Sequence, residues 1–122
     1  MIDIRAKRVY EPEDPQDGFR VLVDRLWPRG MTKEQVKANL WLKDVAPSTV
    51  LRKWLHHDRS KWEEFKRRYF SELDAKPEVV DRLLDEAAKR RVTLLYSARD
   101  AEHNQAIVLR EYLLARAKKG TS

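Results

Sequence analysis

The residues best suited to chemistry follow two apolar runs of the chain, 21–23 and 94–96. After each run an arginine stands close to a carboxylate. The polar and aromatic residues in question are Asp24, Arg25, Trp27 and Arg29 after the first run, and Ser97, Arg99, Asp100, His103 and Asn104 after the second. Arginine binds phosphate and carboxylate groups through two parallel hydrogen bonds. The pattern therefore predicts a site for a small anionic ligand, either phosphate-bearing or nucleotide-like.

Each residue of this predicted site has an expected role. Arg25, Arg29 and Arg99 form the anion clamp, Asp24 is the candidate acid or base, and Tyr96 assists it. The further residues expected to bind the ligand are Lys7, Arg8, Trp27, His57, Ser97, Asp100 and Asn104. A competing interpretation has Asp24 paired with a neighbouring arginine and Asp100 capping a helix, with no ligand, because such contacts are commoner than sites. Whether the protein is an enzyme is left open.

Composition excludes several classes of protein. The 122 residues carry a formal charge of +6 and include no cysteine, so disulfides, iron–sulfur clusters and cysteine nucleophiles are excluded. Only three histidines occur, none at a metal-binding spacing, so we expect no metal and no cofactor. The motifs of dinucleotide-binding proteins, NTPases, α/β-hydrolases and zincins are missing. A charged start and the lack of a long apolar stretch predict a cytoplasmic protein without a membrane span.

Strands and helices alternate along the chain. Residues 4–10, 19–27 and 92–96 are expected to contain strands, the last two covered on both faces because their apolar runs do not alternate with polar residues. The predicted helices are one from Thr32 with Val36 and Leu40 inward, one from Ser48, one from a Ser60–Glu63 capping box, one from Pro77, and one from about Ala101 to Lys118. The pattern favours a small three-layer α/β single domain over residues 1–122, with a short, mainly parallel sheet flanked by helices, and residues 118–122 as a flexible tail. An α+β arrangement is the alternative.

A parallel sheet would bring the candidate residues together. The C-terminal ends of parallel strands share one edge, where ligands of open α/β folds bind. We therefore expect 21–24 and 92–96 to be neighbouring or near-neighbouring parallel strands, with Leu22, Val23, Leu94 and Leu95 buried. The residues that follow them should meet in one cleft.

Several strings of the sequence resemble one known family. They are Lys7–Tyr10, Arg20–Gly30, Ala46–Ser48, Leu51–Trp54 with His57–Asp58, and Thr93–Tyr96 with Ala98–Asp100 and Asn104. Together they resemble the YeaO-like branch of the family called domain of unknown function 488, over nearly the whole chain. The resemblance implies a small, stand-alone, bacterial-type cytoplasmic α/β protein without an established activity. Longer relatives often have a cysteine and a His-Arg pair where this chain has Ser97 and His103–Asn104, so the resemblance carries over no cysteine-dependent chemistry.

Net charge leaves a second functional class open, a nucleic-acid-binding or regulatory module without catalysis. The excess of basic residues would contact phosphates, and Trp27 or Tyr10 would stack on a base. However, acidic residues are interleaved with basic ones, and no known nucleic-acid-binding motif occurs. We therefore expect only weak binding to duplex DNA that is lost as salt is added. A structural or partner-binding role is the third alternative.

Overall fold

A four-stranded parallel sheet lies at the centre of the protein, in a computed structural model that describes residues 2–56 and 58–120. Its strands are β1 (Ile4–Arg8), β2 (Phe19–Leu22), β3 (Leu40–Trp41) and β4 (Val92–Tyr96), in the spatial order β1-β4-β2-β3. The register places Val21 beside Leu94 and Leu22 beside Leu95. Leu22, Val23, Leu94 and Leu95 are fully buried. The predicted parallel pairing of the two apolar runs is thus confirmed.

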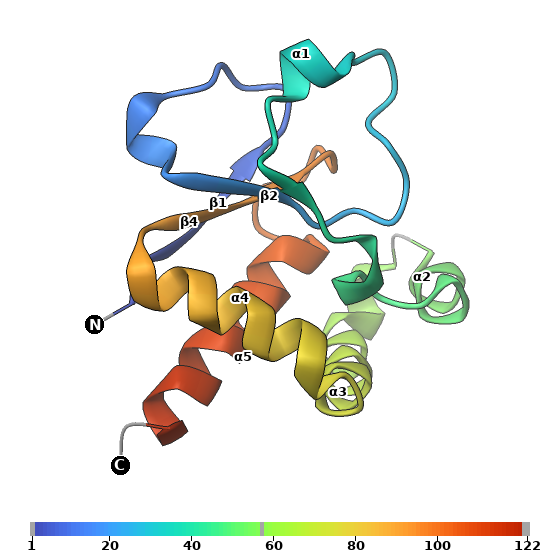
Figure 1. Ribbon diagram of the computed structural model, residues 1–122. Coiled ribbons are helices and arrows are strands. Elements are labelled where there is room, and N and C mark those ends of the chain that lie inside the picture. The colour runs from blue at the N-terminus through green and yellow to red at the C-terminus, as the bar shows by residue number, and fades with distance from the viewer. Residues whose placement is uncertain (1, 57, 121–122) are drawn as a thin grey trace.

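Three helices cover one face of the sheet (Figure 1). They are α3 (Trp62–Asp74), α4 (Pro77–Lys89) and α5 (Gln105–Gly120), and the shorter α2 (Thr49–Leu55) packs against α3. The main core lies between these helices and the sheet, where Val21 and Leu94 meet Tyr69, Leu83 and Leu109. Burying a large apolar side chain contributes about 1.5–3 kcal/mol, so this face supplies most of the hydrophobic stabilisation.

Connecting segments cover the opposite face (Figure 1). They include the crossover from β1 to β2, with its 3-10 turn Pro15–Asp17, and the single-turn helix α1 (Lys33–Val36). Val9, Leu22, Val36 and Leu95 form a small second apolar cluster beneath them. The second covering layer of this α/β domain therefore consists mostly of loops, and polar contacts described below hold it in place.

The prediction that Leu40 lies on the helix begun at Thr32 is wrong. The capping box of Thr32 and Gln35 forms as expected, but Lys37 adopts a left-handed conformation (φ 50°) and ends α1 after one turn. Asn39 then exchanges hydrogen bonds with the backbone of Arg20, at 2.8 Å in each direction. This pairing draws Leu40 into the short edge strand β3.

Two other helix starts differ from expectation. Ser60 and Glu63 form no capping box, because Ser60 bonds to Asp58, which caps a 3-10 turn, and α3 begins at Trp62 without a side-chain cap. The last helix begins at Gln105 because the side chain of Asn104 accepts from the amide of Ile107. It continues to Gly120, and residues 121–122 of the predicted tail lie outside the described residues.

Gly18, directly before β2, lies where the backbone leaves no room for a side chain. Its φ is +68°, and a Cβ added there would lie 2.4 Å from the carbonyl oxygen of Arg91. Gly18→Ala should lower the free energy of unfolding by about 2–4 kcal/mol, because backbone strain and a clash act together. Urea-induced unfolding measures the loss. Gly30 is the matched control: it has φ +78° in open space, so Gly30→Ala should cost only about 1 kcal/mol. Equal losses at the two glycines would refute this account of Gly18.

Candidate functional site

The carboxylate of Asp24 links the ends of two neighbouring strands. Its Oδ2 accepts hydrogen bonds from the backbone N–H and the hydroxyl of Ser97, at 2.9 and 2.6 Å. Its Oδ1 accepts a hydrogen bond from the side-chain amide of Gln105, the first residue of α5. Burial raises the pKa of Asp24, while the bonds from Ser97 and the positive charge of Arg52 oppose the rise. The structure thus brings Asp24 and Ser97 together at the carboxyl edge of the sheet.

Gln105 is a part of this cluster that the sequence reasoning missed. A polar residue six positions after the exposed Arg99 gave no sign that its side chain contacts Asp24. The one available signal was its place at the start of the final helix, close behind the second polar loop.

Asp24→Asn should change how stability depends on pH. Because the folded-state pKa of Asp24 is raised, the native protein holds this proton more tightly than the unfolded chain does. Ionisation of Asp24 therefore destabilises the fold as pH rises from its unfolded pKa of about 3.9 through its folded pKa. The asparagine variant lacks this loss, so its stability relative to the wild type should increase over that range in urea unfolding.

The asparagine is suited to the site. Its carbonyl can accept the hydrogen bonds from Ser97, and the side chain of Gln105 can turn so that its own carbonyl accepts from the new amide. Ser97→Ala removes a hydroxyl donor to the Asp24 carboxylate, so it should steepen the pH-dependent loss. A difference between wild type and Asp24→Asn that stays constant with pH would show that Asp24 has no raised pKa.

Arg25 turns toward the segment that precedes α2. Its Nε donates to the carbonyl of Pro47 at 3.3 Å, and its Nη2 donates to the carbonyl of Ala46 at 3.2 Å. The guanidinium is half-buried, and among the described residues no carboxylate pairs with it. Arg25 therefore fixes the segment before α2, and no ion pair with a described residue balances its positive charge.

Arg8 and Tyr10 connect the end of β1 to both polar loops. The Nε of Arg8 donates to the carbonyls of Ser97 and Ala98, at 3.3 and 3.2 Å, and its guanidinium lies 4.5 Å from the ring centre of Tyr10. The hydroxyl of Tyr10 donates to the carbonyl of Arg29 at 2.9 Å. The side chains of Arg29 and Arg99 are exposed.

Tyr96, Asp100 and Asn104 organise the loop between β4 and α5. Tyr96 is buried, and burial raises the pKa of its phenol, which a hydrogen bond from Asn104 partly offsets. Asn104 also donates to the backbone carbonyl of Asp100 at 2.8 Å. Hydrogen bonds from the amides of Glu102 and His103 hold the pKa of Asp100 at about 2. Asp100 therefore caps the turn before α5, and Asn104 caps the helix itself.

Other expected site residues lie elsewhere or have other partners. Trp27 packs edge-on against Trp41, with ring centres 5.3 Å apart, and its indole N–H donates to the carbonyl of Met31. The Nζ of Lys7 lies 3.1 Å from both carboxylate oxygens of Asp17, on the loop-covered face. His57 lies outside the described residues.

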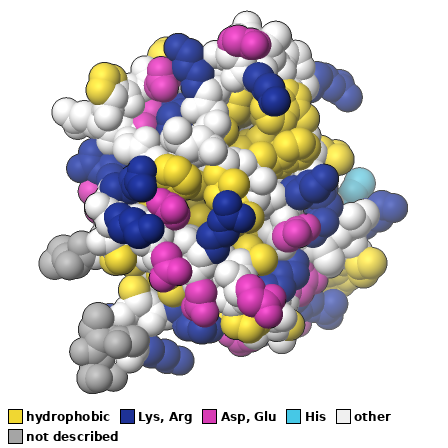
Figure 2. Space-filling view, viewed as in Figure 1, with side chains coloured by type: hydrophobic (Ala, Val, Ile, Leu, Met, Phe, Trp, Pro, Cys, Tyr) yellow, Lys and Arg dark blue, Asp and Glu magenta, His cyan; other side chains and the backbone are white. Residues whose placement is uncertain are grey.

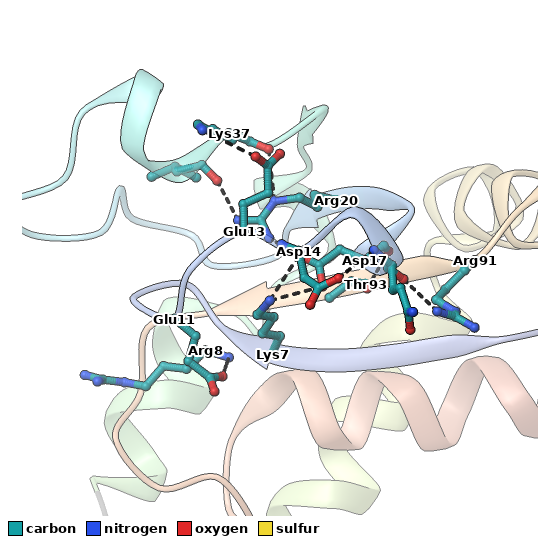
Figure 3. Close-up of polar contacts among 12 residues, drawn as sticks. Lys7, Arg8, Glu11, Glu13, Asp14, Asp17, Arg20, Lys37, Arg91 and Thr93 are labelled. Atoms are coloured by element: carbon teal, nitrogen blue, oxygen red, sulfur yellow. Dashed lines mark hydrogen bonds and ion pairs between the residues drawn. The ribbon is translucent and has the colours of Figure 1, made fainter.

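Asp17 is the centre of a buried polar cluster that the sequence reasoning missed (Figure 3). Besides Lys7 from β1, its carboxylate contacts the guanidinium of Arg20 from β2 at 2.5 Å. Arg20 also donates to the carbonyls of Val36 and Lys37, which ties α1 to the sheet. Burial opposes ionisation of Asp17, but the hydrogen bonds from Asp14, Lys7 and Arg20 outweigh it and lower the pKa. This cluster holds the loop layer on the sheet.

The surface seen in Figure 2 carries basic and acidic side chains intermingled. An apolar area lies toward the upper right, over the loop that follows β2 in Figure 1. Leu26, in the loop that follows β2, and Trp41, in β3, are exposed large hydrophobic residues, with 66% and 38% of their surface accessible. On this face the basic side chains do not form a continuous track.

These features define a small parallel α/β domain whose polar residues gather at the carboxyl edge of its sheet. The chain belongs to the family described as the inactive DUF488-N3 subclade, whose model matches residues 3–121. The resemblance to domain of unknown function 488 is therefore confirmed. Among the described residues, no helix has the length and apolar character that crossing a bilayer requires.

Its relatives are similar along almost their full length. The chain is 43% identical over 112 residues to the uncharacterized protein YeaO of Escherichia coli, covering 92% of this chain and 97% of that protein. It is 41% identical over 113 residues to the uncharacterized proteins Mb3100c of Mycobacterium bovis and Rv3073c of Mycobacterium tuberculosis, covering 93% of this chain and 95% of each. No solved structure matches the chain significantly.

Proposed function

We propose that this protein binds a small anionic, phosphate-bearing ligand at the carboxyl edge of its sheet, as a binding domain rather than an enzyme. The description of its family as an inactive subclade favours binding over catalysis. The bonding of Asp24 supports the same view. Both of its carboxylate oxygens are occupied by Ser97 and Gln105, so its role is to join the strand ends around the site.

One observation carries this proposal: arginines at this edge lack carboxylate partners. In the part of the chain that the structure describes, they are Arg8, Arg25, Arg29, Arg52 and Arg99. The arginines in ion pairs are Arg5, Arg20, Arg59, Arg67, Arg68, Arg90 and Arg91. Three further arginines outside the edge, Arg82, Arg110 and Arg116, also lack an ion pair, and they are spread along α4 and α5.

The charges at this edge favour an anion. Guanidinium groups at one edge that are not balanced by ion pairs repel one another, and a phosphate would neutralise them through short, charge-assisted hydrogen bonds. Arg25 is already fixed by two backbone carbonyls, so it loses little freedom when a ligand binds. Arg52 adds positive charge from α2, because its charge lowers the pKa of Asp24 from across the site. Arg99 adds positive charge from the loop after β4.

Inorganic pyrophosphate should therefore raise the melting temperature of the protein, because a ligand that binds only the native state stabilises it. Arg52→Ala and Arg99→Ala should weaken pyrophosphate binding at least about tenfold each, since a hydrogen bond to a charged group is worth about 1.5–3 kcal/mol. Isothermal titration calorimetry measures both affinities.

The control is Arg67→Ala on α3, which removes an exposed arginine that is paired with Glu64. It lowers the net charge by the same amount, so any effect of overall charge alone should appear in it. No thermal shift for the wild type, or an equal loss of affinity in Arg67→Ala, would rule out a specific anion site at this edge.

A further inference from the structure

A groove of about 250 Å³ lies beside the arginine edge. It is lined by Leu55, Asp58, Arg59, Trp62, Asp100 and His103. One wall comes from the end of α2, the turn after it and the first residue of α3, and the other from the loop between β4 and α5. The volume is below the range of about 300–1,000 Å³ that is typical of sites for drug-sized ligands, so the groove suits a single ring system.

A carboxylate fixes the orientation of the histidine in this groove. Oδ2 of Asp100 lies 3.2 Å from Nδ1 of His103 and 2.6 Å from Nη2 of Arg59. Its Oδ1 accepts hydrogen bonds from the backbone amides of Glu102 and His103. A carboxylate bound at one imidazole nitrogen sets the tautomer and the ring direction. Nδ1 is thus occupied, and among the described residues no hydrogen bond reaches Nε2 of His103, which leaves it available to a ligand.

The apolar part of the groove is also held rigidly. Trp62 stacks on Phe65, with ring centres 5.2 Å apart and planes 19° apart. His103 stands nearly perpendicular to Trp62 at the same centre-to-centre distance. Together with Leu55, these rings give a preformed aromatic and aliphatic surface of the kind on which flat ligands bind.

Asp58 adds a hydrogen-bond acceptor to the lining. Its Oδ1 accepts hydrogen bonds from both the amide and the hydroxyl of Ser60, at 3.0 and 2.6 Å. Within the described parts of the chain no hydrogen bond reaches its Oδ2, which can therefore accept from a donor on a ligand. The groove therefore combines a flat apolar surface with one imidazole nitrogen and one carboxylate oxygen.

We propose that this groove binds a heteroaromatic ring with an amino group, of the nucleobase class. The ring lies against Trp62 and Leu55, Nε2 of His103 accepts a hydrogen bond from an N–H of the base, and the amino group also donates to Asp58. This inference rests on the proposed anion site, because Arg99 directly precedes Asp100 and so places the phosphate end of one nucleotide-like ligand next to its ring.

The test titrates adenosine, guanosine and cytidine, which lack phosphate, and pyrophosphate, which lacks a ring, against the full chain. Amide and indole NMR signals report the site of binding, and calorimetry with ADP and pyrophosphate reports affinity. At least one nucleoside should shift the indole signal of Trp62 and the amide signal of His103. His103→Ala should weaken binding of ADP at least tenfold and leave pyrophosphate binding unchanged, whereas His103→Gln, which keeps a polar group, should lose less.

The outcomes separate the two proposals. If no nucleoside moves the groove signals while pyrophosphate still binds, the groove inference fails and the anion site stands. If nucleosides bind and pyrophosphate does not, the anion site fails and the groove remains. Equal weakening of ADP and pyrophosphate by His103→Ala would also overturn the inference, because His103 would then act through the loop rather than on the ring.

Discussion

We expect Arg20→Met to lower the free energy of unfolding by about 3–5 kcal/mol, the usual cost of removing one partner of a buried ion pair. Only 3% of the Arg20 side chain is exposed, and its guanidinium contacts Asp17 as well as the carbonyls of Val36 and Lys37. Methionine retains much of the apolar stem but removes a donor from all three acceptors, and it leaves Lys7 as the one basic side chain that contacts Asp17 among the described residues. Urea unfolding followed by tryptophan fluorescence measures the change.

A double variant tests whether the loss comes from the pair. Asp17→Asn combined with Arg20→Met also removes the carboxylate that Arg20→Met leaves with Lys7 alone, so the double variant should lose less stability than the sum of the single variants, by about 0.5–3 kcal/mol. Arg67→Met, which breaks an exposed ion pair on α3, should leave stability nearly unchanged. Strict additivity of the single losses would mean that Asp17 and Arg20 act independently.

The second large effect is expected at Tyr69. Its side chain is fully buried, it packs against Phe65, and its hydroxyl donates to the carbonyl of Val45 at 2.6 Å. Tyr69→Ala should lower the free energy of unfolding by about 3–5 kcal/mol, because it opens a cavity of aromatic size in the main core. Thermal and urea unfolding both measure it.

Tyr69→Phe separates packing from hydrogen bonding. It keeps the ring and leaves the Val45 carbonyl without its donor, so it should cost about 1–3 kcal/mol. The adjacent carbonyl of Ala46 holds Arg25, so Tyr69→Phe should also weaken pyrophosphate binding without abolishing it. A phenylalanine variant as unstable as the alanine variant would assign the whole effect to the hydroxyl.

The main features of the sheet could be read from the sequence because buried parallel strands have a recognisable pattern. The runs around Val21 and Leu94 do not alternate, which predicted two central strands that are neighbours or near-neighbours, and the structure pairs them directly. β3 could not be found in this way, because a strand of two residues is too short to show a periodic pattern of apolar side chains. Its pairing also depends on the hydrogen bond between Asn39 and Arg20, which are far apart in the sequence.

The part of the site that follows the two central strands was also predictable from the sequence. Asp24 and Ser97 meet because both follow parallel strands, which the sequence pattern indicates. The carbonyl partners of Arg25 depend on the path of the chain between β3 and α2, which has no local signal. The Asp17–Arg20 pair was missed because charged residues are rarely buried, so sequence reasoning places them on the surface by default.

The two edges of the sheet offer a direct comparison for the central claim. At the amino edge, Arg90 and Arg91 stand beside Lys89 but are paired with Glu86 and Asp3. At the carboxyl edge, Arg25, Arg52 and Arg99 have no such partners among the described residues. Both edges carry several arginines, and the two sets differ in whether they are paired.

An NMR titration of the uniformly ¹⁵N-labelled protein with inorganic pyrophosphate tests whether the carboxyl edge holds a specific anion site. We expect saturable shifts of backbone amide signals in residues 24–29, 46–52 and 97–105, with those of 87–91 unmoved. Shifts confined to residues 87–91, or a weak linear drift of basic residues over the whole surface, would contradict this expectation.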